Sequence, residues 1–208
     1  MLTLSVASGM YRTNVHVLAE GPGAACVIVD PGHQAFQPVL DLVEKHRLTP
    51  EAVLLTHGHM DHTWDAAPLA DHFGVPAWIH PADRYQLGAP AKGLPANWPQ
   101  DELVDHPNRE PAEVRALPEQ EAELRLAGIG LTVLPSPGHT GGSVMFLAEG
   151  DRPVLLSGDT LLAGGPGRSD APGGSSTALR RSLQQLAARV PAGTRLLPGH
   201  GPTAALAG

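Results

Sequence analysis

The chain has 208 residues, a formal net charge of −7 and a pI of about 5.8. This length predicts a single domain over residues 1–208, with a core large enough to fold without disulfides. The acidic balance argues against a nucleic-acid partner, since proteins that bind nucleic acids carry basic surfaces, and the one cysteine excludes an internal disulfide.

The N-terminus carries no basic and apolar leader, and every apolar run is shorter than the roughly 20 residues that cross a membrane. Together with the single cysteine, these features predict a cytoplasmic protein that has no membrane partner. They leave the oligomeric state open.

Hydrophobic patterning predicts alternating strands and helices in the first third of the chain. A half-buried strand is expected over residues 14–18, and a fully buried one over 24–29. A helix over 37–47, a strand over 52–55 and a second helix over about 65–73 follow. This order of elements is typical of a layered α/β fold.

The rest of the chain begins with a short strand over 77–79. The proline-rich stretch 85–112 is irregular, and we expect it to form loops that shape a pocket. Further strands are predicted over 123–126, 131–134, 144–147 and 154–157. A helix capped by Ser176 or Thr177 then leads to a last strand over 195–197.

Histidine and aspartate residues recur where predicted strands end. The densest group is His57-x-His59-x-Asp61-His62, which directly follows the strand over 52–55. Three glycine-flanked turns add further candidates: Pro137-Gly138-His139-Thr140, Ser157-Gly158-Asp159-Thr160 and Pro198-Gly199-His200-Gly201. Glycine permits a sharp backbone turn, so each of these turns can present one polar side chain at the end of a strand.

Imidazoles and carboxylates in this number indicate a metal centre. Without a cation, two carboxylates about 5 Å apart repel each other by roughly 3 kcal/mol at an effective dielectric near 20. Together the two side-chain types suit zinc, iron or manganese. Two divalent cations, two aspartates and a hydroxide leave a net charge of about +1, which favours an anionic small-molecule substrate and an oxyanion transition state.

Taken in order, these motifs resemble the metallo-β-lactamase superfamily, and within it the small glyoxalase II-like (hydroxyacylglutathione hydrolase-like) enzymes. The resemblance rests on Val29-Asp30-Pro31-Gly32, Thr56-His57-Gly58-His59-Met60-Asp61-His62, Pro137-Gly138-His139-Thr140-Gly141-Gly142-Ser143, Ser157-Gly158-Asp159-Thr160 and Leu197-Pro198-Gly199-His200-Gly201. Gly167-Arg168-Ser169-Asp170, followed by Gly173-Gly174-Ser175, is similar to the loop that follows the bridging aspartate in those enzymes. The implied fold class is α/β, an αββα sandwich with metals at one edge.

The resemblance also implies how the ligands divide between two divalent metal ions, expected to be zinc, with iron or manganese as alternatives. One metal would be held by His57, His59 and His139. The other would be held by Asp61, His62 and His200, with Asp159 bridging both. Asp30 would orient a histidine ligand, and Asp61 and Asp159 are the expected catalytic residues.

Such a centre predicts a hydrolase in which a hydroxide shared by the metals attacks the carbonyl carbon of a thioester, the S-acyl-thiol substrate of glyoxalase II-like enzymes. A mononuclear iron persulfide dioxygenase, a small lactone or ester hydrolase and a non-catalytic binding module are the alternatives. Eight residues follow His200, where glyoxalase II has a helical domain that helps to bind glutathione, so the thiol carrier is left open. Arg168 either reaches an anionic substrate or braces its loop through an ion pair.

Overall fold

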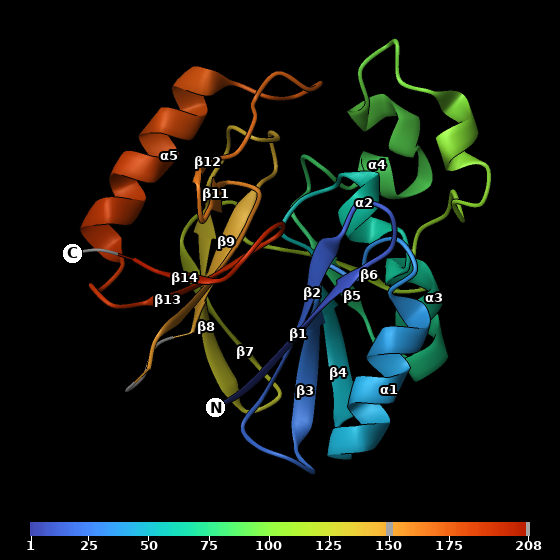
Figure 1. Ribbon diagram of the computed structural model, residues 1–208, viewed down its shortest axis with the longest axis vertical. Helices are drawn as coiled ribbons and strands as arrows, with labels where there is room; N and C mark the ends of the chain where they lie inside the picture. The colour runs from blue at the N-terminus through green and yellow to red at the C-terminus, as the bar shows by residue number, and fades with distance from the viewer. Residues whose placement is uncertain (149–151, 207–208) are drawn as a thin grey trace.

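The computed structural model describes residues 1–148 and 152–206, and within them two six-stranded sheets pack face to face (Figure 1). The first sheet has the order β1-β2-β3-β4-β5-β6. Its strands are β1 (Leu2–Ser8), β2 (Thr13–Ala19), β3 (Ala25–Val29), β4 (Thr49–Leu54), β5 (Ala77–Ile79) and β6 (Val114–Ala116). The first three strands pair antiparallel, and β3 to β6 pair parallel.

Parallel strands need crossover connections, and here these connections place helices on the outer face of the first sheet. Helix α1 (Phe36–His46) joins β3 to β4, and α3 (Ala66–Phe73) joins β4 to β5. A short helix, α2 (Met60–Thr63), precedes α3. The apolar faces of α1 and α3 pack on residues such as Ile28 and Val53, which point outward from the sheet.

The second sheet has the order β14-β13-β10-β9-β8-β7. Its strands are β7 (Ala122–Leu126), β8 (Ile129–Pro135), β9 (Val144–Ala148), β10 (Val154–Gly158), β13 (Arg195–Pro198) and β14 (Ala204–Ala205). The parallel pair β10 and β13 is connected through the small hairpin β11 (Leu161–Leu162) and β12 (Gly165–Pro166), then through α5 (Ser176–Arg189). Helix α5 covers the outer face of this sheet (Figure 1).

The main core lies between the two sheets. Leu54 and Val29 from the first sheet belong to one cluster with Phe146 and Leu131 from the second, and all four are almost fully buried. Strands covered on both faces read as continuous apolar runs, which is why β3 and β9 show no alternation in the sequence. The predicted αββα sandwich is therefore confirmed.

Several local predictions need correction. Strands β6 and β14, the hairpin β11–β12 and helix α2 were not predicted, since each is short. Strand β1 was also missed, although Leu2, Leu4 and Val6 alternate along it and pack on one core cluster. The cap of α5 is Ser175, whose Oγ accepts a hydrogen bond from the Ala178 backbone N–H at 3.3 Å, instead of Ser176 or Thr177. None of the helices in the two described ranges has the length and apolar composition that a bilayer crossing requires.

The stretch 85–112, predicted to be irregular, holds three short helices: α4 (Tyr85–Gly88) and the 3-10 helices η1 (Pro90–Gly93) and η2 (Gln100–Leu103). No helix in it exceeds four residues, because prolines interrupt the backbone hydrogen bonding. The segment lies beyond the end of the first sheet at which β4 leads into α2 (Figure 1).

Candidate metal centre

The seven predicted metal ligands meet at one edge of the sandwich. His57 and His59 follow β4, and Asp61 and His62 belong to α2. His139 lies between β8 and β9. Asp159 follows β10 and His200 follows β13. The first sheet thus supplies one half of the site and the second sheet the other.

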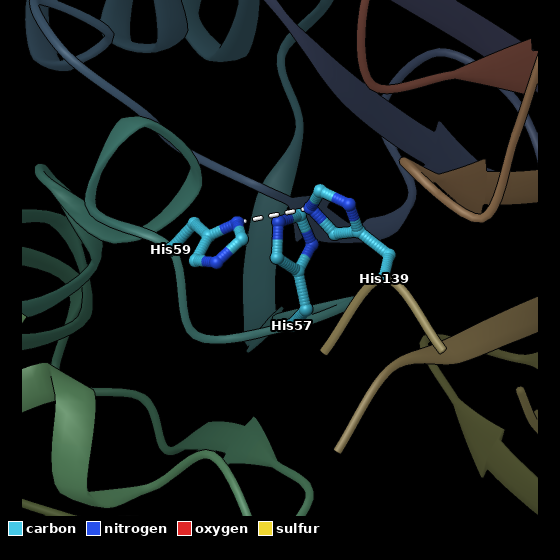
Figure 2. Close-up of side chains that lie close together, drawn as sticks. All are labelled: His57, His59 and His139. Atoms are coloured by element: carbon cyan, nitrogen blue, oxygen red, sulfur yellow. Dashed lines mark hydrogen bonds between the residues drawn. The ribbon is translucent and has the colours of Figure 1, made fainter. Parts of the chain in front are cut away.

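One group contains His57, His59 and His139, whose potential ligand atoms lie within 4.8 Å of one another (Figure 2). His139 Nε2 is 2.9 Å from His59 Nδ1, and the His57 ring centroid is 4.7 Å from that of His139. All three side chains are buried. We call this group the first triad.

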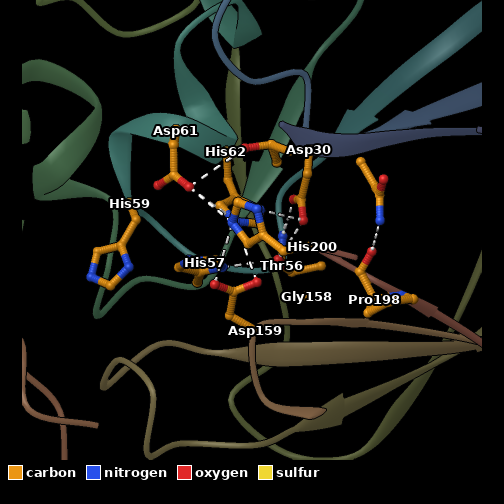
Figure 3. A network of polar contacts seen from close by, with 12 residues as sticks. Asp30, Thr56, His57, His59, Asp61, His62, Gly158, Asp159, Pro198 and His200 are labelled. Atoms are coloured by element: carbon orange, nitrogen blue, oxygen red, sulfur yellow. Dashed lines mark hydrogen bonds and ion pairs between the residues drawn. The ribbon is translucent and has the colours of Figure 1, made fainter. Parts of the chain in front are cut away.

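A second triad contains Asp61, His62 and His200 (Figure 3). His200 Nε2 lies 3.0 Å from Asp61 Oδ2 and 3.2 Å from His62 Nε2. The remaining distance, from His62 Nε2 to Asp61 Oδ2, is 3.6 Å. Asp61 and His200 are only partly buried, so this triad faces the outside more than the first does.

Asp159 lies between the two triads (Figure 3). Its Oδ1 is 3.5 Å from His62 Nε2, and its Oδ2 is 3.6 Å from His200 Nε2 and 3.8 Å from His139 Nε2. One carboxylate therefore faces ring nitrogens of both groups, which is the position that a ligand shared by two ions would need.

The chemistry of these donors fits divalent cations. His57 Nε2 and Asp159 Oδ1 are buried without a hydrogen-bond partner among the described residues, which is costly unless another group satisfies them. Two pairs of imidazoles also face each other nitrogen to nitrogen, so in each pair one ring must donate a proton and the other must accept it. Cations between these atoms would satisfy all of them, and imidazole with carboxylate suits zinc, iron or manganese.

The electrostatics of the triads differ. Burial, reinforced by the neighbouring histidines, holds the pKa of His57 well below its usual range, and burial followed by His139 lowers the pKa of His59 to about 3. Burial lowers the pKa of His139 as well, so all three rings of the first triad favour the neutral imidazole, the form that donates to a metal.

In the second triad, burial alone would lower the pKa of His62, but Asp61, Asp159 and Asp30 together raise it to about 10. Burial opposes ionisation of Asp61 too, yet His62 and His200 hold the pKa of its carboxyl well below its usual range. The surrounding carboxylates therefore attract a positive charge to His62 Nε2, and without a metal a proton supplies it.

Asp30 holds His62 in place from behind. Its Oδ2 is 2.9 Å from His62 Nδ1 and accepts a hydrogen bond from Thr56 Oγ1 at 2.6 Å, and its Oδ1 accepts one from the Thr56 N–H at 2.8 Å. Asp30, His57 and His62 also form a group close enough to bind an ion. Both Asp30 oxygens already accept hydrogen bonds, so this carboxylate is placed to orient the His62 ring.

Asp83 is a residue that the sequence analysis missed. It is 1% exposed and accepts hydrogen bonds from the Gly58 N–H at 2.9 Å, from Thr140 Oγ1 at 2.6 Å and from the Gly142 N–H at 2.9 Å. It thereby ties the loop of His57 and His59 to the loop of His139. The one signal in the sequence is its place four residues beyond the end of β5, which is not specific.

Two glycines of the predicted motifs owe their identity to close backbone packing. A Cβ on Gly32 would lie 1.7 Å from the Asp61 carbonyl oxygen, and one on Gly167 would lie 1.8 Å from the Asp159 carbonyl oxygen. Any side chain at either position would displace a residue of the metal centre. This steric demand explains why the motifs around Asp30 and Arg168 contain glycine.

A cavity of about 260 Å³ opens directly over the triads. His59, Asp61, His139, Asp159 and His200 line it. Leu94, Pro95 and Trp98 from the 85–112 segment also line it, together with Tyr11, Met60, Arg168 and Ala171. The segment therefore contributes to the pocket, as the sequence analysis predicted.

Arg168 braces its loop. Its guanidinium pairs with Asp170, with Nε to Oδ1 at 2.8 Å and Nη2 to Oδ2 at 3.2 Å. Its backbone carbonyl lies 2.7 Å from His139 Nδ1, which orients that ring. The ion pair, one of the two roles predicted for this residue, is therefore present, and Arg168 also lines the cavity.

Similarity to known proteins agrees with this geometry. The family model described as "Metallo-beta-lactamase superfamily" matches residues 9–200. An uncharacterised protein of Mycobacterium tuberculosis is 42% identical over 206 residues, with 97% of this chain and 91% of that protein covered. Hydroxyacylglutathione hydrolase GloC of Haemophilus influenzae is 33% identical over 176 residues, with 84% and 79% covered.

Solved structures are similar over almost the whole chain. The BLEG-1 B3 metallo-beta-lactamase superposes with a TM-score of 0.82 at 29% identity, covering 98% of this chain and 94% of that one. TTHA1623 in a di-iron-bound form superposes with a TM-score of 0.80 at 34% identity, covering 97% and 94%. The chain therefore belongs to the metallo-β-lactamase superfamily, whose members are mostly metal-dependent hydrolases.

Proposed function

We propose that this chain is a binuclear metal-dependent hydrolase that cleaves a thioester, the glyoxalase II-like reaction on an S-acyl-thiol substrate. The observation that carries the proposal is the position of Asp159, whose two carboxylate oxygens face ring nitrogens of both triads. The similarity to a protein named hydroxyacylglutathione hydrolase supports the thioester class.

In this proposal, His57, His59 and His139 hold one ion, Asp61, His62 and His200 hold the other, and Asp159 is shared. Such ions supply a water with a pKa near 7 and polarise the substrate carbonyl. Asp61 and Asp159 line the cavity, so their carboxylate oxygens can accept a hydrogen bond from the attacking water and orient it. Arg168 holds the His139 ring through its carbonyl oxygen.

Zinc is the metal that we propose, with iron or manganese as alternatives, because imidazole and carboxylate suit all three. A similar protein has been crystallised in a di-iron-bound form.

Elemental mass spectrometry of the purified protein, followed by an assay of acyl-thioesters, tests the proposal. About two ions per chain and thioester cleavage are expected. About one iron per chain, with oxygen uptake on a persulfide substrate, would instead support the mononuclear iron dioxygenase.

The shared ligand provides the sharpest mutational test. Asp159→Ala should lower kcat/KM by at least about 100-fold, because removing the bridge disturbs both ion positions. Asp41→Ala, at an exposed aspartate on α1, is the matched control and should keep the wild-type rate. A fully active Asp159→Ala variant would contradict the two-metal proposal, whatever metal the wild-type protein contains.

A further inference from the structure

Three residues of the 85–112 segment give the cavity over the triads an apolar part of its lining. Leu94 and Trp98 are partly buried and pack against a small cluster of Met60, Trp64 and Leu103. Together with Pro95 they line the cavity, and we call these three residues the apolar wall. A substrate group that reaches this wall therefore exchanges water for carbon-rich surface, which is favourable only for an apolar group.

The charged residues of the cavity offer little to a charged acyl group. Arg168 is the one lysine or arginine among the described residues that line the cavity, and its guanidinium is already paired with Asp170. An acyl group that carries its own carboxylate would therefore have to break the Arg168–Asp170 pair to form an ion pair with a side chain of the cavity.

The cavity is too small to hold both the acyl group and the thiol carrier. A volume of about 260 Å³ is below the range of roughly 300–1,000 Å³ typical of pockets that enclose a drug-sized ligand. A thiol carrier with charged or peptide-like parts does not fit inside with the acyl group. One of the two parts must therefore extend into solvent, and a charged or peptide-like carrier loses less there because it keeps its hydration. We accordingly place the acyl group in the cavity.

Building on the proposed thioester hydrolysis, we infer that the acyl group is a short, uncharged alkyl chain that lies against Leu94, Pro95 and Trp98. An anionic carrier remains compatible with this assignment, because it lies outside the cavity. Each methylene that is fully buried contributes about 0.8 kcal/mol, which converts to a three- to fourfold gain in kcat/KM. The gain should end once the chain fills the cavity.

Thioesters of one uncharged thiol, N-acetylcysteamine, test this inference with the zinc-loaded full chain. Acetyl, propanoyl, butanoyl and hexanoyl esters give the dependence on chain length, and kcat/KM should rise about threefold per methylene at first. The 2-hydroxypropanoyl ester differs from the propanoyl ester by one hydroxyl group and should be the poorer substrate. A flat series, or preference for the hydroxylated ester, would overturn the inference while leaving thioester hydrolysis intact.

A pair of variants assigns the effect to the apolar wall. Leu94→Asn keeps the size of the side chain but adds an amide, so it should flatten the chain-length series and leave the acetyl ester least affected. Val104→Asn, at a residue that is 75% exposed in the same segment, should keep the wild-type series. An unchanged series in Leu94→Asn would contradict the placement of the acyl group.

A binding measurement tests the inference without relying on catalysis. Calorimetric titration of the zinc-loaded protein with acetate, butanoate and hexanoate should give increasing affinity along the series, and Leu94→Asn should remove the increase. If no thioester is cleaved, the proposed function fails, yet this titration still decides whether the cavity selects alkyl chains. Equal affinity for all three carboxylates would overturn the inference.

Discussion

Asp83 accepts three hydrogen bonds from two loops that carry histidines of the first triad. All three partners are donors, so an amide in its place would point an N–H group at another N–H or O–H group. Asp83→Asn should therefore destabilise the protein by about 2–4 kcal/mol, since hydrogen bonds to a buried charge are strong and an unpaired buried group is costly. It should also weaken zinc affinity by roughly 10- to 100-fold.

Urea unfolding of the metal-free protein and zinc titration with a competing chelator measure the two effects of Asp83→Asn separately. Asp71→Asn is the control, because Asp71 also accepts hydrogen bonds, from Arg109 and the Ala112 N–H, but lies at the surface. Its cost should stay below about 1 kcal/mol. A stable Asp83→Asn variant with normal zinc affinity would show that the two loops hold their positions without this carboxylate.

The buried His106 predicts how the free energy of unfolding depends on pH. Burial lowers its pKa to about 4, and its Nδ1 accepts a hydrogen bond from the Asn108 N–H. The folded pKa lies below the unfolded value of about 6.5, so the unfolded state takes up the proton first as pH falls. The folded state should therefore lose roughly 2 kcal/mol between pH 6.5 and 4, and none above pH 6.5.

His106→Gln keeps an acceptor at this position but does not titrate. The difference in unfolding free energy between wild type and this variant should be constant above pH 6.5 and shift in favour of the variant below it. Urea unfolding at several pH values measures this difference. A difference that stays constant down to pH 4 would show that the buried ring is protonated at no cost.

The meeting of the candidate ligands at one place was predictable because their signal is local. Four of them, His57, His59, Asp61 and His62, stand in one short motif, and each of the other three directly follows a glycine after a predicted strand. Asp83 and Asn14 lack such a pattern. Asn14 donates from Nδ2 to the Pro198 carbonyl at 3.0 Å and from its backbone to the Gly199 carbonyl at 2.7 Å. These contacts exist only after the two sheets have met, so spacing along the chain does not reveal them.

At the scale of elements, α5 packs directly on the loop that carries His139. Gly138 has φ +147°, and a Cβ there would lie 2.3 Å from the Leu179 Cα in the helix backbone. Ser182 Oγ donates to the Pro137 carbonyl at 2.8 Å, and the Ser175 N–H donates to the Gly138 carbonyl at 2.8 Å. These contacts hold the loop against α5 and thereby fix the position of His139 relative to the second sheet.

Gly138→Ala should push this loop away from α5. We expect a loss of about 3 kcal/mol in stability, from backbone strain and overpacking together, and weaker zinc binding in the first triad. Gly141→Ala changes the same loop where the nearest atom is 3.8 Å from the added Cβ, so it should cost far less. Thermal unfolding and zinc titration of both variants test this, and equal effects would contradict the role of the helix contact.

Elements with a clear apolar pattern were predicted to within a few residues, as β9 and α3 illustrate. Most of those that failed are too short to show a pattern, but β1 was missed although its apolar residues alternate. Strand β6 has three residues and is fixed by pairing with β5, and α2 is a single turn whose side chains serve the metal centre. The 85–112 segment is shaped by contacts such as Leu103 with Met60, which connect parts of the chain far apart in sequence.

At the scale of the whole molecule, the candidate metal centre spans the two sheets. Each triad takes residues from both halves of the chain: His139 completes a group begun by His57 and His59, and His200 completes one begun by Asp61 and His62. Ions bound there would link the sheets, whereas the unfolded chain does not hold the ligands together. Metal binding should therefore be coupled to global stability.

Removal of metal by a chelator should lower Tm for this reason. With free zinc at about 100 times its Kd, one site contributes about 2.7 kcal/mol, which corresponds to a Tm higher by roughly 5–10 °C for a chain of this length. Zinc added back should restore Tm, and Asp159→Ala should reduce the gain because it affects both triads. Differential scanning calorimetry of the chelated and reloaded protein measures the shift. An equal Tm with and without zinc would mean that the two sheets reach their final packing independently of the centre between them.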